Sequence, residues 1–136
     1  MSAKKVTLVN KEVLNLFQGL LAVKEMKGSR FAILVAKNLK EMKKVLDPLD
    51  AMAIPTQEFQ ELSVEMNKLI EAEDGEAIKK LEETNSELID ARKEQLEGVN
   101  SKLEESSEVY IYSIKEDQLP EDITGEQIER LLEIIE

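Results

Sequence analysis

Residues 10–31, NKEVLNLFQGLLAVKEMKGSRF, contain the pattern that decides the fold. Their large apolar side chains recur at steps of three and four residues, which predicts a helix with a broad apolar face. Asn10 is a residue type preferred at a helix N-cap, and the helix is expected to cover residues 10–27. Gly28 suits the position just after a helix, and Ser29 suits the cap of the next one. The stretch therefore predicts a helical hairpin.

The same periodicity continues beyond this hairpin and predicts three more helices. A second helix is expected over residues 29–47, where Pro48 interrupts the pattern and is expected to begin a separate short turn. A third is expected over residues 56–72, and the Asp74-Gly75 pair then predicts a turn. The longest and most polar helix is expected over residues 76–106.

The apolar stripe of residues 76–106 is narrow and resembles a coiled-coil seam. It contains Leu81, Leu88 and Leu96, with Asn85 and Arg92 in the same seam. Two partners for this stripe remain open. It packs either against the apolar stripe of residues 56–72, folded back across the turn, or against a second copy of the chain.

The last third of the chain changes period. Residues 109–114 are rich in β-forming side chains and predict a strand that pairs with residues 6–9. Thr124 and Gln127 predict a capping box at the start of a helix over residues 124–135. We therefore expect a single, mostly α-helical domain over residues 1–136. It consists of antiparallel helical hairpins or a bundle, a small two-stranded antiparallel ribbon and a C-terminal helix.

The composition argues against catalysis. The 136 residues include no His and no Cys, which removes the commonest general base, thiolate nucleophiles and the usual zinc ligands. The five glycines are scattered and form no phosphate-binding loop. The abundant carboxylates are expected on solvated surfaces. The sequence thus predicts a protein that is not an enzyme and that binds no metal and no cofactor.

The net charge of −11 is unevenly distributed. Residues 1–54 carry a balance of +5 and residues 55–136 a balance of −16. This pattern fits either a bipolar surface that attracts partners or basic and acidic helices that pair within the fold. The acidity of the whole chain and its lack of interleaved aromatic residues argue against nucleic acid as a partner. The polar N-terminus and the absence of a long apolar run predict a cytoplasmic protein that does not enter a membrane.

Three short stretches together resemble small uncharacterised proteins encoded by tailed bacteriophages. They are Asn10-Lys11-Glu12-Val13 at the first helix, Gly28-Ser29-Arg30-Phe31 at the hairpin junction, and Leu119-Pro120-Glu121-Asp122-Ile123 before the last helix. The resemblance covers most of the chain in order and length. It implies a phage context, in the host cytoplasm or the virion, and it carries over no catalytic residue.

These observations predict a non-catalytic protein that binds other proteins, as a phage accessory or virion-assembly component, through self-association or contacts with other virion proteins. The alternative is an acidic inhibitor of a host nucleic-acid-binding enzyme or defence protein. The candidate partner-binding residues lie on the narrow helical stripe, on the second strand and on the last helix: Leu81, Leu88, Leu96, Tyr110, Tyr112, Ile128, Leu131 and Leu132.

Overall fold

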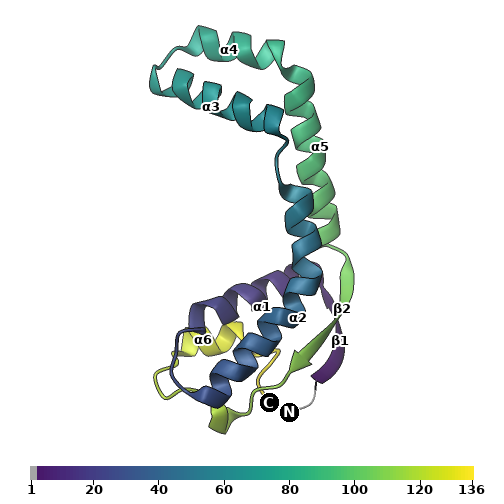
Figure 1. The fold of residues 1–136 in the computed structure, drawn as a ribbon, viewed down its shortest axis with the longest axis vertical. Coiled ribbons are helices and arrows are strands. Elements are labelled where there is room, and N and C mark those ends of the chain that lie inside the picture. The colour runs from purple at the N-terminus through teal and green to yellow at the C-terminus, as the bar shows by residue number, and fades with distance from the viewer. Residues whose placement is uncertain (1–2) are drawn as a thin grey trace. The chain divides into compact units, whose positions relative to one another are not determined.

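The computed structural model describes residues 3–136, which divide into two compact units. We call the described residues 3–49 and 102–136 the core unit, and residues 50–101 the acidic unit. The order of elements along the chain is β1 (Ala3–Val9), α1 (Asn10–Val23), α2 (Ser29–Ala53), α3 (Gln57–Glu71), α4 (Gly75–Thr84), α5 (Ser86–Leu103), β2 (Ser106–Tyr112), η1 (Glu116–Gln118) and α6 (Gly125–Arg130) (Figure 1). The expected class, mostly α with one antiparallel ribbon and a C-terminal helix, is confirmed.

The ribbon joins the two ends of the core unit. Strands β1 and β2 pair antiparallel, with Ala3 opposite Tyr112, Val6 opposite Val109 and Val9 opposite Ser106. The paired region begins three residues earlier than expected on both strands. Ile114, which was expected in the strand, instead forms a separate parallel bridge with Ile135.

The hydrophobic core lies between α1, α2, β2 and the C-terminal segment, which Figure 1 shows packed together in the core unit. The side chains at three- and four-residue steps in α1 and α2 form most of it, and alternate residues of β2 complete it. The buried hydrophobic residues are Val13, Leu16, Leu20, Val23, Phe31, Leu34, Val35, Met42, Leu46, Leu49, Val109, Ile111, Ile114, Leu131 and Ile134.

Two buried asparagines attach the ribbon to the helices. The side-chain amide of Asn38 donates to the carbonyl of Tyr112 at 2.8 Å, and its oxygen accepts from the N–H of Tyr112 at 2.8 Å. Asn10 donates to the carbonyl of Lys102 at 2.7 Å and accepts from the hydroxyl of Ser107. Because each buried amide is satisfied by groups distant in sequence, these asparagines help to fix which elements meet.

The helix α1 ends earlier than the predicted residue 27. Its last helical residue is Val23, and the chain then turns until Gly28, whose φ of 126° lies in the region that side chains disfavour. Gly28 thus makes the reversal that the sequence predicted, one turn beyond the end of the helix.

Proline 48 lies inside α2, so the prediction that the helix ends at residue 47 is wrong. Pro48 cannot donate a hydrogen bond to the carbonyl four residues earlier, but it is exposed, and water can reach that carbonyl. Leu46 and Leu49 are buried on either side of it. Their packing holds the chain helical across a residue that would otherwise interrupt it.

The C-terminal helix is shorter than the predicted 124–135. The predicted capping box is present: Thr124 accepts from the N–H of Gln127, and the Gln127 side chain accepts from the N–H of Thr124. However, α6 ends at Arg130, because the segment beyond it pairs with Ile114. The N–H of Ile114 donates to Ile134 at 2.9 Å, and that of Glu136 donates to Ile114 at 2.8 Å. Long-range pairing has replaced the last helical turns.

The acidic unit consists of α3, α4, most of α5 and the end of α2. Thr56 caps α3 by accepting from the N–H of Phe59, and Asp74 caps α4 by accepting from the N–H of Ala77. Between them, Glu73 adopts a φ of 55° in the turn. The turn predicted at Asp74-Gly75 therefore joins two capped helices.

The single helix predicted over residues 76–106 is in fact two helices, α4 and α5, separated at Asn85. The side chains of Thr84 and Asn85 donate back to the carbonyls of Lys80 and Leu81, at 2.8 and 3.0 Å. Such bonds to the preceding turn compete with the helical ladder and favour a bend or a break. The polar Asn85, which the seam pattern placed within a continuous helix, is the C-cap of α4.

Candidate protein-interaction surface

The predicted residues of the last helix do not form one surface. Leu131 is 0% exposed and belongs to the core, whereas its neighbour Leu132 is 59% exposed. Ile128 is half-buried. The prediction that Leu131 is available to a partner is therefore wrong, because α6 and the following residues use Leu131 and Ile134 to pack on the core unit.

The two tyrosines of β2 differ in their accessibility. Tyr110 is 46% exposed and lies opposite Lys5 on the ribbon. Tyr112 is half-buried, and the Lys37 ammonium lies 5.2 Å from its ring centre. Asn38 also holds the backbone of Tyr112. Tyr110 remains a candidate for partner contact, while Tyr112 has a structural role within the core unit.

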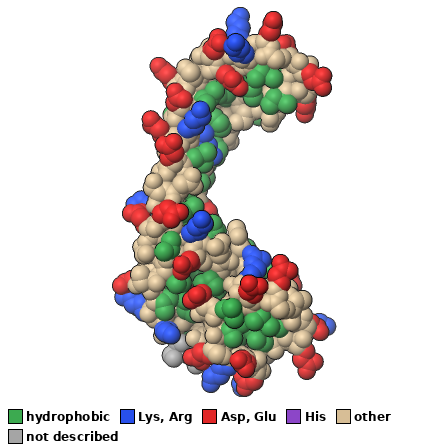
Figure 2. All heavy atoms as spheres, turned by 180° about the vertical axis from the view of Figure 1, so that it is seen from behind, with side chains coloured by type: hydrophobic (Ala, Val, Ile, Leu, Met, Phe, Trp, Pro, Cys, Tyr) green, Lys and Arg blue, Asp and Glu red, His purple; other side chains and the backbone are tan. Residues whose placement is uncertain are grey.

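The remaining candidates, Leu81, Leu88 and Leu96, belong to the acidic unit. Leu96 is 41% exposed, and Leu81 and Leu88 are half-buried against α3. In residues 50–101, all of which the structure describes, Leu62 is the one hydrophobic side chain that is buried, and it is still 7% exposed. Figure 2 shows hydrophobic side chains on the surface of this unit, at the top of the view, with carboxylates around them.

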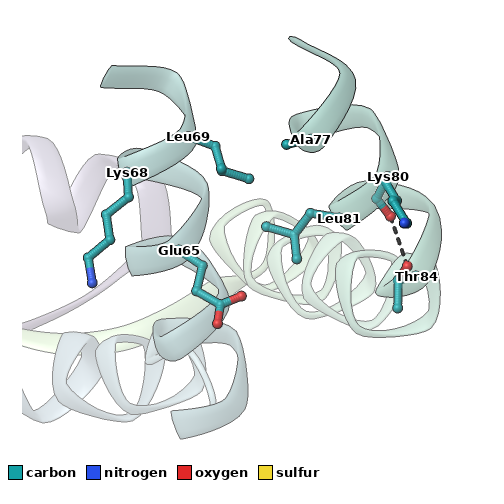
Figure 3. Close-up of a pocket in the computed structure, with 7 residues that line it drawn as sticks. All are labelled: Glu65, Lys68, Leu69, Ala77, Lys80, Leu81 and Thr84. Carbon is teal, nitrogen blue, oxygen red and sulfur yellow. Dashed lines mark hydrogen bonds between the residues drawn. The ribbon is translucent and has the colours of Figure 1, made fainter. Parts of the chain in front are cut away.

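A hollow of about 540 Å³ lies between α3 and α4. Its surface is mainly apolar, and in Figure 3 the side chains of Leu69, Ala77 and Leu81 point toward one another across it. The carboxylate of Glu65 lies at its opening, whereas Lys68 points away from the three apolar side chains. The hollow is shallow and open to solvent, and the small side chain of Ala77 is one of those that line it.

A second hollow continues the first along α3. It is lined by Leu62 and Leu88 and shares Glu65 with the first hollow, and it adds Glu58 and Glu61. These three glutamates are spaced at i, i+3 and i+7, so they follow one edge of α3. We call the two hollows together the α3 groove. Leucines form its floor and carboxylates one edge; the first hollow is mainly apolar, whereas the second, which Asn85 also lines, is mainly polar.

The electrostatics of the α3 groove follow from the charge of its unit. Residues 50–101 contain 14 Asp and Glu against five Lys and Arg, a net charge of −9, whereas the core unit has a net charge of −2. Within the described chain, Glu58, Glu61 and Glu65 form no ion pair at 4 Å or less. Lys68 and Lys80, at one end of the groove, offset the acidity only in part.

Ion pairing between the basic and acidic parts of the chain is seen at the ribbon. Lys5 and Glu108 lie 2.9 Å apart, and this hydrogen-bonded carboxylate raises the pKa of Lys5. The contribution of the pair is therefore present below the ordinary lysine pKa and is lost as the pH rises through the raised value. Both side chains are exposed, so this pair adds little to stability.

Two side chains of α5 hold the end of α2 in place within the acidic unit. Arg92 donates to the carbonyl of Ala53 at 2.8 Å and lies 5.6 Å from the ring centre of Phe59. Gln95 donates to the carbonyls of Met52 and Ile54, at 2.8 and 2.7 Å. These side chains satisfy carbonyls that the end of a helix leaves without partners. Arg92, which the sequence placed in an apolar seam, is thus a cap for another helix.

The sequence missed the carboxylate edge of the α3 groove. The signal was present as the i, i+3, i+7 spacing of Glu58, Glu61 and Glu65. Because the chain has so many carboxylates, this spacing alone did not indicate a binding surface. The structure gives it meaning by placing this edge of α3 beside α4 and the start of α5. Across residues 3–136, no group of three or more Asp and Glu side chains is arranged to hold a metal ion. In the same residues, no helix is long and apolar enough to cross a membrane.

Comparisons of the chain with protein-family models, with curated proteins and with solved structures gave no match.

Proposed function

We propose that this chain is a non-catalytic protein that binds another protein through its acidic unit. The observation that carries the proposal is the difference between helicity and burial in residues 50–101. Three helices with apolar stripes fold there, yet Leu62 is the one buried hydrophobic residue, and Met52, Ile54, Val64, Ile70 and Leu96 are exposed. Figure 2 shows hydrophobic side chains gathered on the surface of this unit with carboxylates around them, and contiguous apolar patches with a polar rim are typical of interaction surfaces.

The resemblance to tailed-phage proteins supports a setting in which the partner is a virion or assembly protein. In that setting, mass spectrometry of purified particles should detect the chain at a fixed ratio to the other structural proteins. Its absence from particles, with normal amounts in infected cells, would remove the virion version and leave an intracellular partner.

Chemical cross-linking in the cells that produce the protein tests the acidic unit as the binding part. Cross-links to another protein are expected from the lysines of residues 50–101, which include Lys68, Lys79, Lys80 and Lys93. A Leu132→Asp variant, changed at an exposed leucine of the core unit, is the control and should keep these cross-links. Partner cross-links that come only from core-unit lysines would contradict the proposal.

A second candidate is inhibition of a nucleic-acid-binding protein, and the concentration of charge in residues 50–101 favours it. A surface of net charge −9 attracts basic proteins over several ångströms, and salt screens this attraction. Such an inhibitor should compete with nucleic acid for its target and should bind more weakly as salt rises from about 50 to about 500 mM. Binding that neither salt nor nucleic acid alters would exclude this candidate.

A further inference from the structure

The α3 groove is a docking site for one kind of partner segment, and we infer that this segment is a basic amphipathic helix from a different protein. The inference rests on the proposed function and names the chemistry of the partner. It is carried by the leucine floor of the groove, by the three carboxylates along its edge and by the charge of the unit around it.

The shape of the groove favours a helix. The groove runs along α3, whose 15 residues span about 22 Å. Leu62 and Leu69 from α3, with Leu81 and Leu88 from the facing helices, form its floor. A helix with apolar side chains at i, i+3, i+4 and i+7 presents a stripe that fits such a floor. A bound helix would add a second layer over the acidic unit, which buries very few of its own apolar side chains.

The negative charge of the groove favours a partner helix with basic side chains on its polar face. Glu58, Glu61 and Glu65 follow one edge of α3 and form no ion pair within the described chain. Lys or Arg residues at helical spacing in the partner would lie opposite them. These residues would also be attracted by the net charge of −9 of residues 50–101.

The same charge argues against a second copy of this chain as the occupant through the same groove. Two acidic units facing each other would bring together two net charges of −9. Like charges placed opposite one another oppose association. A partner helix with an apolar stripe and basic side chains complements both the leucine floor and the carboxylate edge. An acidic amphipathic helix complements the floor alone.

The direct test uses a synthetic peptide as the probe. A Leu/Lys peptide of about 18 residues, with Leu at i, i+3, i+4 and i+7, is titrated with the full-length protein and followed by fluorescence anisotropy. The matched control is the same peptide with Glu in place of each Lys. The Leu/Lys peptide is expected to bind, and more weakly at high salt, whereas the Leu/Glu peptide is not. Equal binding of both peptides, or no binding of the Leu/Lys peptide, would overturn the inference.

Matched variants of the protein separate the groove from general acidity. One carries Glu58→Lys, Glu61→Lys and Glu65→Lys, and the control carries Asp90→Lys, Glu94→Lys and Glu97→Lys on α5, outside the groove. Both change the net charge equally. The groove variant should bind the Leu/Lys peptide at least about tenfold more weakly than the control variant does at low salt. Equal loss in both variants would show attraction to the unit as a whole and would overturn the groove as the site.

A Leu81→Asp variant tests the floor and the alternative occupant together. This variant should no longer bind the Leu/Lys peptide, and circular dichroism should show the helical content of the wild type. Light scattering should give the same mass for both proteins. A wild-type dimer that Leu81→Asp converts to a monomer would identify a second copy as the occupant and overturn the inference. Failure of the peptide experiments leaves the cross-linking test of the acidic unit unaffected, so the two proposals fail separately.

Discussion

The core unit and the acidic unit are both largely helical, but they bury their side chains to very different extents. Fifteen hydrophobic residues are buried in the core unit, whereas residues 50–101 bury one. In the core unit, β2 and the C-terminal segment cover the apolar faces of α1 and α2. In the acidic unit, α3 packs mainly on α4, and α5 contacts the end of α2 through Arg92 and Gln95. An amphipathic helix becomes a core element only when a second layer covers it.

Leu131 and Leu132 provide the largest expected contrast, since they are neighbours with opposite burial. Leu131→Ala should lower the free energy of unfolding by about 2–5 kcal/mol, because it removes packed methyl groups and leaves a cavity. Leu132→Ala should change it by less than about 0.5 kcal/mol. Urea unfolding followed by circular dichroism measures both. Similar losses in the two variants would mean that the end of α6 is not packed as described.

Asn38 is expected to have the next largest effect. Asn38→Ala leaves the N–H and carbonyl of Tyr112 without their partner, which should cost about 2–3 kcal/mol of unfolding free energy. The control is Asn67→Ala on the exposed side of α3, which should change stability by less than about 0.5 kcal/mol. A loss at Asn38 no larger than that at Asn67 would contradict its role in joining the ribbon to α2.

Arg92 tests whether the acidic unit opens independently of the core unit. Arg92→Ala removes the hydrogen bond to the carbonyl of Ala53 and should lower the local stability of residues 50–101 by about 1 kcal/mol. Hydrogen exchange should then become faster in those residues and stay unchanged around Val13 and Leu20. Lys93→Ala, at the next and exposed position, serves as the control. Faster exchange across the whole chain would show that the two units unfold together.

Two glycines inside helices give the smallest contrast. Gly98 has open space around it, so Gly98→Ala should stabilise the protein by about 0.5–1 kcal/mol through higher helix propensity. A Cβ at Gly19 would lie 3.2 Å from the Cβ of Arg130 and from a methyl of Leu131. Gly19→Ala should therefore give no gain, because α6 would have to move. Thermal unfolding of the two variants compares them, and an equal gain at both positions would show that α1 and α6 are loosely packed.

The sequence predicted the helices of the hairpins better than it predicted their ends. The periodicity of residues 10–31 and the capping box at Thr124 and Gln127 act within one or two turns, and both are present in the structure. One error is local, since Thr84 and Asn85 bond back to the preceding turn and divide the helix predicted over residues 76–106. Two others lie where distant groups intervene. Pro48 continues a helix because Leu46 and Leu49 are buried beside it, and α6 ends early because its following residues pair with Ile114.

The candidate surface was predictable in part. Leu81 and Leu88 were identified from their spacing, and they line the α3 groove. Leu131 shares the stripe of its helix and is nevertheless in the core. Spacing shows which side chains share a face of a helix, but it does not show what covers that face. The carboxylate edge of α3 could not be distinguished from other acidic residues for the same reason.

The sequence by itself determined the helical class, the two strand-forming segments, the absence of His and Cys chemistry and the concentration of negative charge after residue 54. These properties depend on residue type and on short-range spacing. Only the tertiary structure decided that Pro48 stays within a helix, that Leu131 is buried while Leu132 is exposed, and that a leucine floor meets a glutamate edge along α3. These properties depend on contacts between segments far apart in the chain, and burial is a property of such contacts.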